Sequence, residues 1–372
     1  MSRAMNFNAG PASLPLAALE RARDELLDFE GSGMSVMEHS HRGKVYERVH
    51  AEAPALVGEL LELPRDTYDV LFVQGGASQA FAQIAMNFLS AGQTADYVVT
   101  GAWGEKAVAE ARATAKLIGG EVHVAGDSRE GGTYARVPRQ DELRPSAGAA
   151  YLHCTSNETI HGVEYALDAA TPFPESDAPL VCDMSSDILG RRIPSTKFAL
   201  IYAGAQKNIG PSGVTIVAAK KDLVARGRKD IPKIFQYRTA AENDSLYNTP
   251  PTFGIYLVRN VLGWLKEQGG VAAAEARNRK KAAYLYDAIE SSGGFYRCPV
   301  EPGCRSIMNV VWRLPSEELE AAFVKEAEKE RMVGLKGHRS VGGVRASIYN
   351  AVEPAWCEAL AGFMKDFAKR RG

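Results

Sequence analysis

The chain has 372 residues, of which 45% are hydrophobic and 24% are charged. This is the composition of a globular protein, and the length suits two or three domains of about 150 residues. The 44 Lys and Arg residues nearly balance the 45 Asp and Glu residues, for a net charge of −1. The balance excludes a generic nucleic-acid binder, which would carry a basic excess, and a disordered chain.

No apolar run reaches the roughly 18 residues that a membrane-spanning helix needs. The first 15 residues lack the pattern of a signal peptide, in which charged residues precede an apolar stretch, so we expect a cytoplasmic protein. The five cysteines include no Cys-x-x-Cys pair. In that compartment this favours free thiols, with closure of a small loop by Cys298 and Cys304 as the alternative.

The first 60 residues predict two helices around a loop. Apolar residues recur at helical spacing from Leu16 to Leu27 and again from Val45 to Leu60. The loop at 31–43 carries two histidines and one arginine.

From residue 69 the chain alternates short apolar runs with helical stretches, which predicts a mostly parallel sheet covered by helices on both faces. The predicted strands are 69–73, 96–100, 121–125, 149–153, 180–184, 198–202 and 214–218, and the predicted helices among them are 79–89 and 105–117. Ligands of such sheets bind at the carboxyl ends of the strands. Polar residues just after each run are therefore the first candidates for a site.

The last third of the chain predicts a smaller α/β unit. Its predicted elements are helices at 252–266 and 272–291, then a strand at 308–312, a helix at 316–331, a strand at 344–348 and a helix at 354–370. We expect a large domain over residues 15–264, and a small domain over 265–372 joined by the N-terminal segment 1–14.

Two of the strand ends carry features that suit a flat, phosphorylated ligand. The turn Gln74-Gly-Gly-Ala-Ser78 permits close backbone approach, and the helix that follows it offers free amides to a phosphate. An ordinary strand-to-helix turn explains the same residues equally well. Trp103 follows the next strand and can stack on a flat ring, although a single aromatic there is more often part of the core.

Three further strand ends carry polar residues. Asn157 and Thr159 follow the strand at 149–153 and can donate to a ligand or simply form a turn. Asp183 ends an apolar strand, where a carboxylate is costly unless a positive group faces it. Lys207 lies in a loop of small residues, where it is either a solvated lysine or a partly buried amine with a lowered pKa that can act as a nucleophile.

Together these features are the parts needed to hold pyridoxal phosphate. The glycine turn would bind the phosphate, the indole would stack on the ring, the carboxylate would keep the pyridine nitrogen protonated, and the lysine would form the Schiff base. Each feature alone is weak. Their occurrence in this order at successive strand ends predicts the cofactor.

The chain as a whole resembles the phosphoserine aminotransferase family, which belongs to the class-V aminotransferases and to the fold-type I pyridoxal phosphate enzymes. The resemblance rests on motifs in the family's order, which are Asn6-Phe-Asn-Ala-Gly-Pro-Ala, Met37-Glu-His-Ser-His-Arg-Gly, Gln74-Gly-Gly-Ala-Ser, Asn157-Glu-Thr-Ile, Ala205-Gln-Lys-Asn-Ile-Gly-Pro-Ser-Gly, Tyr247-Asn-Thr-Pro-Pro-Thr and Gly337-His-Arg-Ser-Val-Gly-Gly-Val-Arg-Ala-Ser. It implies a large domain with a mainly parallel, seven-stranded type of sheet, and a smaller C-terminal α/β domain.

The resemblance also implies how the cofactor is held. Lys207 would carry it as a Schiff base, Asp183 would face the ring nitrogen, Trp103 would stack on the ring and Thr159 would reach the phenolic oxygen. The phosphate would be bound by Gly76, Ala77, Ser78 and Gln206, and by Asn248 and Thr249 of the second subunit of a homodimer.

The substrates implied are glutamate and 3-phosphohydroxypyruvate. Arginine suits bidentate capture of carboxylate and phosphate. Arg345 would hold the α-carboxylate, and the two His-Arg pairs, His41-Arg42 and His338-Arg339, would hold the phosphate or the distal carboxylate of glutamate. No carboxylate is spaced to complete a metal site with the histidines of the 31–43 loop.

Two alternatives remain open on the sequence. One is another class-V enzyme, either a serine–glyoxylate aminotransferase or a cysteine desulfurase. A desulfurase needs a nucleophilic cysteine on a mobile loop, whereas Cys154 and Cys182 fall in or beside predicted strands. The other is a protein that binds the cofactor without catalysis, which would have no use for the His-Arg pairs.

Overall fold

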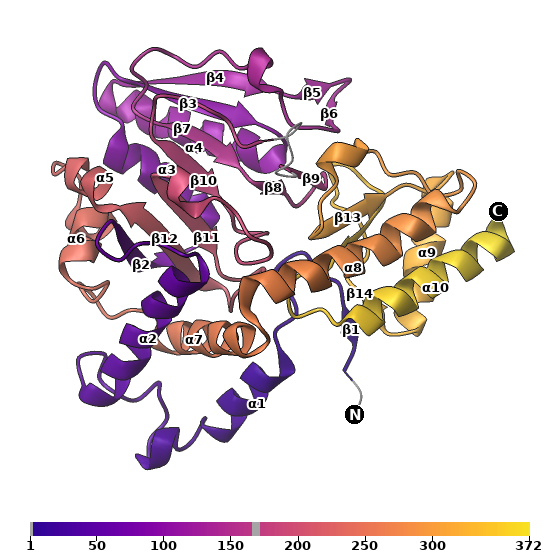
Figure 1. The fold of residues 1–372 in the computed structure, drawn as a ribbon, viewed down its shortest axis with the longest axis horizontal. Helices are drawn as coiled ribbons and strands as arrows, with labels where there is room; N and C mark the ends of the chain where they lie inside the picture. Colours follow the sequence, from indigo (N-terminus) through magenta and orange to yellow (C-terminus); the bar gives the residue numbers. More distant parts are fainter. Residues whose placement is uncertain (1–2, 166–171) are drawn as a thin grey trace.

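The computed structural model describes residues 3–165 and 172–372, and its centre is a seven-stranded β-sheet (Figure 1). The strand order is β2-β12-β11-β10-β7-β3-β4. The strands are β2 (Tyr68–Gly75), β3 (Thr94–Val99), β4 (Glu121–Asp127), β7 (Leu152–Thr155), β10 (Leu180–Asp183), β11 (Leu200–Gly204) and β12 (Gly213–Lys220). Strand β12 is antiparallel to both neighbours and the other pairings are parallel. The predicted α/β fold with a mainly parallel sheet is confirmed.

Helices cover this sheet because its strands are apolar on both faces. Every residue of β10 and β11 is buried, the pattern of strands that lie inside a parallel sheet. Two helices pack side by side against the sheet, α3 (Ala77–Phe88) and α4 (Ala102–Ile118), and two pack on each other beside the β2 edge, α2 (Lys44–Leu60) and α7 (Thr252–Glu267). Shorter helices complete this part, α1 (Leu16–Asp24), α5 (Lys221–Arg226) and α6 (Tyr237–Glu242).

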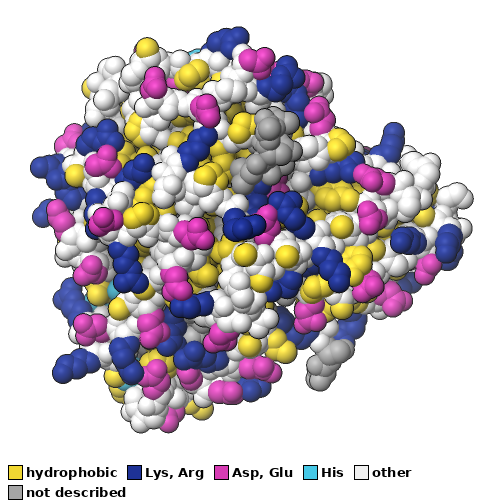
Figure 2. All heavy atoms as spheres, viewed as in Figure 1, with side chains coloured by type: hydrophobic (Ala, Val, Ile, Leu, Met, Phe, Trp, Pro, Cys, Tyr) yellow, Lys and Arg dark blue, Asp and Glu magenta, His cyan; other side chains and the backbone are white. Residues whose placement is uncertain are grey.

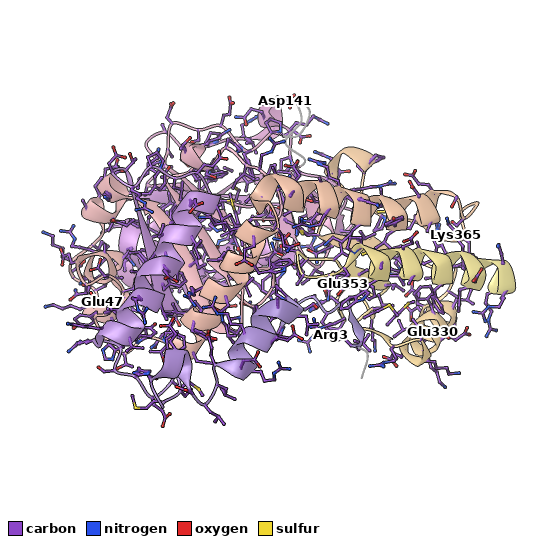
Figure 3. All side chains as sticks on the ribbon, turned by 60° about the horizontal axis from the view of Figure 1, so that its bottom comes forward. Arg3, Glu47, Asp141, Glu330, Glu353 and Lys365 are labelled. Atoms are coloured by element: carbon purple, nitrogen blue, oxygen red, sulfur yellow. The ribbon has the colours of Figure 1, made fainter. Side chains whose placement is uncertain are left out.

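A second hydrophobic core lies to the right of the sheet in Figure 1. It is enclosed by α8 (Gly270–Glu290), α9 (Glu317–Lys329), α10 (Pro354–Arg371) and the antiparallel pair β13 (Asn309–Trp312) and β15 (Val344–Ser347). Figure 3 shows α8 and α10 lying side by side, with Glu353 and Lys365 marking the course of α10. Helix α8 joins the two cores, since Ala274 packs in the first and Leu285 in the second.

The N-terminal segment belongs to the second core. Strand β1 (Met5–Asn6) pairs in parallel with β14 (Met332–Val333), and Phe7 is buried in the second core. The segment therefore starts beside the last third of the chain and then runs toward the sheet. The remaining short elements are β5 (Arg129–Glu130), β6 (Thr133–Tyr134), β8 (Asn157–Glu158), β9 (Val163–Glu164) and the 3-10 turns Phe29–Gly31, Gln140–Glu142, Ser195–Lys197, Lys233–Phe235 and Pro302–Cys304.

The surface carries charges of both signs interspersed on the face seen in Figure 2, as expected for a chain with balanced charge. None of the helices described is both long enough and apolar enough to cross a bilayer. None of the five cysteines, all within the described residues, forms a disulfide, which agrees with the prediction of thiols.

Candidate active site

The candidate residues gather where the carboxyl ends of the parallel strands meet. The glycine turn follows β2, Trp103 follows β3, Thr159 follows β7, Asp183 ends β10 and Lys207 follows β11. Because these five strands run in the same direction, their ends lie at one edge of the sheet. The pairing of the antiparallel strand β12 brings the Lys207 loop to the glycine turn. Gly213, at the end of that loop, pairs with Gly75 of the turn.

Lys207 points toward two of the predicted site residues. Its Nζ donates a hydrogen bond to Thr159 Oγ1 at 2.6 Å and lies 4.8 Å from the centre of the Trp103 ring. Burial lowers the pKa of Lys207 to about 8, although the carboxylates of Asp183 and Glu158 oppose that shift. About a tenth of the amine is therefore uncharged at pH 7, far more than for an ordinary lysine, and the uncharged form is the one that acts as a nucleophile or a base.

The N-terminal segment packs against Lys207 from the side of the second core. A Cβ added to Gly10 would lie 3.2 Å from Lys207 Cγ, and Gly10 has a φ of +145° that other residues rarely adopt. The next contacts fix the segment, since Ala12 donates its N–H to the Gln206 carbonyl at 2.9 Å and Tyr349 donates its hydroxyl to the Ala9 carbonyl at 2.8 Å. Glycine at position 10 thus allows the backbone of the N-terminal segment to lie directly against the Lys207 side chain.

Asp183 is a buried carboxylate, only 4% exposed. The hydroxyl and the backbone N–H of Ser185 both donate to its Oδ1, at 2.5 and 2.9 Å, and Oδ2 receives neither bond. Burial raises the pKa of Asp183, while Lys207 and the Ser185 hydrogen bonds oppose the rise. Ser185 thus orients the carboxylate and favours its charged form.

The glycine turn leads into α3 without a side-chain cap. Gly76 is the N-cap residue, and no side chain accepts a hydrogen bond from the first turn of the helix. A Cβ placed on Gly76 would meet nothing within 4 Å. The open backbone amides and the positive end of the helix macrodipole make this turn suitable for an anion.

Three predicted substrate residues meet on the other side of Thr159. Arg345, 9% exposed, donates from Nη1 to the Thr159 carbonyl at 3.2 Å, and its buried Nε has no hydrogen-bond partner among the residues described. Burial lowers the pKa of His338, and the positive charges of Arg345, Lys106 and Arg339 lower it further. These groups therefore place several positive charges near one another, and that of Arg345 also lowers the pKa of Lys207.

The remaining predicted residues do not join this cluster within one chain. His41 and Arg42 line a separate cavity of about 650 Å³, which is bordered by α2, by residues 68–72 of β2 and by the segment Ala241–Leu246. Asn248 and Thr249 are exposed, and the Thr249 carbonyl accepts a hydrogen bond from Gln74 Nε2 at 2.9 Å.

Sequence reasoning missed three residues that the structure adds to the site. Glu158 is completely buried and bonds the first turn of α4, Ser185 holds Asp183, and Lys106 places its ammonium 4.3 Å from the Trp103 ring centre. The one available signal was the position of Glu158 within the quoted motif Asn157-Glu-Thr-Ile, directly before Thr159.

The arrangement fits pyridoxal phosphate. An uncapped helix start suits the phosphate, a buried carboxylate suits the ring nitrogen, and an indole face lies beside an amine with a lowered pKa. Several buried polar atoms at the strand ends, Thr155 Oγ1, Trp103 Nε1 and Arg345 Nε, also find no partner in the described part of the chain. Within residues 3–165 and 172–372, no three His, Cys, Asp or Glu side chains gather as a metal site would require.

Comparison with known proteins agrees with this assignment. The family model described as "Aminotransferase class-V" matches residues 4–360. A phosphoserine aminotransferase of Niallia circulans is 56% identical over 371 residues, which cover 100% of this chain and 99% of that protein.

Solved structures show the same similarity. A phosphoserine aminotransferase from Bacillus circulans subsp. alkalophilus superposes with a TM-score of 0.94 at 56% identity, covering 100% of this chain and 99% of the other. A phosphoserine aminotransferase from Trichomonas vaginalis with bound pyridoxal phosphate superposes with a TM-score of 0.91 at 39% identity, covering 98% of this chain and 100% of the other.

Proposed function

The chain belongs to the class-V aminotransferase family, and within it to the phosphoserine aminotransferases, and from this premise we propose which of its residues carry the reaction. The protein is a pyridoxal-phosphate-dependent transaminase of serine biosynthesis. It transfers an amino group between glutamate and 3-phosphohydroxypyruvate, giving 2-oxoglutarate and O-phosphoserine. The observation that carries the residue assignment is the position of Lys207 Nζ, 2.6 Å from Thr159 Oγ1 and beside Trp103.

Lys207 is the proposed attachment point of the cofactor. Pyridoxal phosphate supplies an aldehyde that takes up the amino group and a ring that draws electrons from the substrate carbon. The lowered pKa of Lys207 supports this role, because the uncharged amine is the form that bonds an aldehyde. The amides of Gly76, Ala77 and Ser78, together with Gln206, would hold the phosphate.

Asp183 and Trp103 would orient the ring. The carboxylate of Asp183 would favour a protonated ring nitrogen. Lys207 and the Ser185 hydrogen bonds favour the charged form of that carboxylate, and Ser185 also orients it. Trp103 offers a flat face next to the lysine, and Thr159, already bonded to Lys207, can donate to the phenolic oxygen. These groups prepare the site before substrate binds.

The proton transfer is assigned to Lys207 as well. With pyridoxal phosphate and substrate bound, the free amine of Lys207 would be the group that removes a proton from the substrate α-carbon and returns one. With a pKa near 8, the group can both accept and return a proton near neutral pH.

The positive side chains near Lys207 would hold the substrate. Arg345 would bind the α-carboxylate, because its buried guanidinium has an unpartnered Nε in the described part of the chain. His338 and Arg339 would bind the phosphate or the distal carboxylate of glutamate. A serine–glyoxylate aminotransferase would have no use for the second clamp, and a desulfurase is not favoured because Cys154 and Cys182 are buried on adjacent strands.

We further propose that two chains form a homodimer that completes each site. His41 and Arg42 line a cavity apart from the chain's own Lys207 cluster, so they would serve the partner's site. Asn248 and Thr249 are exposed, with the Thr249 carbonyl bonded to Gln74 of the glycine turn, and the family resemblance assigns them to the partner's phosphate. Large exposed side chains lie near them in sequence, namely Leu26, Leu27, Met34, Met37 and Tyr247, and such surfaces mark interfaces.

The same proposal extends to the domains and the compartment. The two hydrophobic cores support a large domain at 15–264 and a small domain at 265–372 joined by segment 1–14. The five cysteines, none of which forms a disulfide, support a cytoplasmic enzyme.

The cofactor assignment is tested by the colour of the purified protein. The parent should show a visible absorption band that glutamate bleaches, and Lys207→Ala should lack that band and lose activity by more than a hundredfold. Lys106→Ala is the control, because it removes the other ammonium beside Trp103 and should keep the band. A colourless parent, or a Lys207→Ala protein with an unchanged spectrum, would refute the assignment.

A further inference from the structure

Glu158 is a buried carboxylate that the proposed reaction does not use. It lies on β8, directly after the strand that leads to the site, and is completely inaccessible to solvent. Its Oε2 accepts the backbone N–H of Trp103 at 3.0 Å and its Oε1 accepts that of Gly104 at 2.8 Å. Both bonds go to the first turn of α4, where backbone donors lack partners within the helix.

The fit between this carboxylate and the helix depends on a glycine. A Cβ on Gly101 would lie 2.4 Å from the Glu158 carboxyl carbon, which is closer than any real contact. A Cβ on Gly104 would lie 3.2 Å from Val99 Cα and 3.5 Å from Glu158 Oε1. The start of α4 is therefore shaped to receive this one side chain.

The segment that carries Glu158 also carries the partner of the lysine. Glu158 turns toward α4 and bonds Trp103, whereas the next residue, Thr159, turns toward Lys207 and accepts its hydrogen bond. The adjacent residues Glu158 and Thr159 thus fix the indole of Trp103 and the amine of Lys207 relative to each other.

Glu158 also contributes charge to the lysine. Its carboxylate raises the pKa of Lys207, as does Asp183, against the effects of burial and of Arg345. Burial and the charge of Asp183 raise the pKa of Glu158 to about 7, and Lys207 and the two helix amides oppose that rise. Above that pH the lysine therefore faces two carboxylates rather than one.

We propose that Glu158 is a positioning residue of the transaminase, which fixes Trp103 through the first turn of α4 and keeps a second negative charge beside Lys207. The inference rests on the proposed roles of Lys207 and Trp103. It adds a residue that touches neither cofactor nor substrate and acts through groups that do.

The test uses the holoenzyme and two variants. Glu158→Gln keeps the shape and removes the charge. The pKa of the nitrogen that joins Lys207 to the cofactor, read from the visible absorbance, should therefore fall by about 0.5 unit or more, because a neighbouring carboxylate stabilises the protonated form. Glu158→Asp keeps the charge but shortens the reach, so it should leave that pKa within about 0.3 unit and change the visible circular dichroism of the cofactor beside Trp103.

The control is Glu105→Gln, which removes a carboxylate from the same first turn. Glu105 is partly exposed and bonds Arg129 and Tyr134. Its replacement should therefore change neither the pKa read from the absorbance nor the visible circular dichroism. A Glu158→Gln holoenzyme that titrates like the parent would overturn the inference, while a parent that never binds cofactor would overturn the proposed function instead.

A further measurement uses only the parent protein, so it does not depend on the folding of a variant. Hydrogen exchange of the Trp103 and Gly104 amides in the holoenzyme should be at least tenfold slower than that of Val271 and Ala272, which begin α8 without a side-chain cap. Equal exchange rates at the two helix starts would contradict the proposed bonds from Glu158.

Discussion

Asp183 shows how one neighbouring side chain sets the state of a buried acid. The surroundings of this carboxylate are apolar enough to raise its pKa, which would favour the neutral form that cannot keep a ring nitrogen protonated. Ser185 supplies two donors to one oxygen, and hydrogen bonds to a carboxylate favour its charge. The hydroxyl also accepts the Gly204 N–H at 3.0 Å, which ties Asp183 to the strand that leads to Lys207.

Replacing Ser185 by alanine should therefore weaken catalysis through the ionisation of Asp183. A hydrogen bond to a charged group is worth about 1.5–3 kcal/mol, so kcat at pH 7 should fall by about tenfold or more. Since the lost bond had lowered the pKa of Asp183, the acid limb of the pH–activity profile should move to higher pH. Ser185→Thr keeps a hydroxyl and should restore both values, and an unmoved acid limb in Ser185→Ala would contradict the role.

At the scale of elements, the short pair β8 and β9 connects the site to the second core. Its far end places Glu164, Asp187 and Arg191 in one buried cluster, with Arg191 Nε 2.8 Å from Glu164 Oε1 and Arg191 Nη2 3.1 Å from Asp187 Oδ2. Glu164 Oε2 in turn accepts the Ile307 N–H at 2.6 Å, just before β13. One arginine thus pairs with two buried acids and holds the hairpin between the cores.

Arg191→Met should be strongly destabilising, because it leaves two carboxylates buried without their counter-charge. We expect a loss of about 3–5 kcal/mol in the free energy of unfolding, measured by urea titration of the holoenzyme. Arg139→Met removes one partner of an exposed pair with Glu142 and should cost less than about 1 kcal/mol. Similar losses in the two variants would show that the buried cluster contributes no more than a surface pair.

The longer elements could be read from the sequence because their patterns are physical. Continuous apolar runs such as 180–184 and 198–202 mark strands that are buried on both faces, and β10 and β11 lie there. The two-residue strands β1, β8, β9 and β14 were not predicted. Two residues are too few to show the alternating pattern of a strand, and their pairing depends on tertiary contacts. Helices α5 and α6 span six residues each, too few for a helical period to be distinguished.

The site residues that lie at strand ends could be predicted together with the strands themselves. Asp183 and Lys207 lie at strand ends, and a parallel sheet brings strand ends together whatever the details of packing. The role of Glu158 could not be predicted, because it depends on which way one side chain of a two-residue strand turns. The separation of His41 and Arg42 from Arg345 could not be predicted either, since their spacing in sequence holds no information about which cavity each one lines.

At the scale of the whole molecule, the site depends on parts that come from both cores, and our proposal is that a second chain completes it. Arg345 and the N-terminal segment approach Lys207 from the second core. The segment that carries Leu26, Leu27, Met34 and Met37 follows α1, which projects at the lower edge of Figure 1. Leu27, four residues before the 31–43 loop begins, is 83% exposed, and under the proposed dimer a second copy of the chain would cover it.

A mixed dimer tests this arrangement directly. Lys207→Ala and Arg42→Ala should each have little activity alone, because each lacks one group in both sites. In a mixed dimer, the intact Arg42 of one subunit would complete the site around the intact Lys207 of the other. Random reassociation at equal amounts gives mixed dimers half of the time, each with one of two sites intact, so activity should recover to about a quarter of the parent's.

The matched mixture is Lys207→Ala with Arg345→Ala. Both of these groups serve the site of their own chain, so no subunit can supply what its partner lacks, and activity should not recover. Recovery in the first mixture and not in the second would require Arg42 to act across the interface. If the Arg42→Ala mixture stayed as inactive as its components, His41 and Arg42 would have to reach Lys207 within one chain, through a rearrangement of the 31–43 loop.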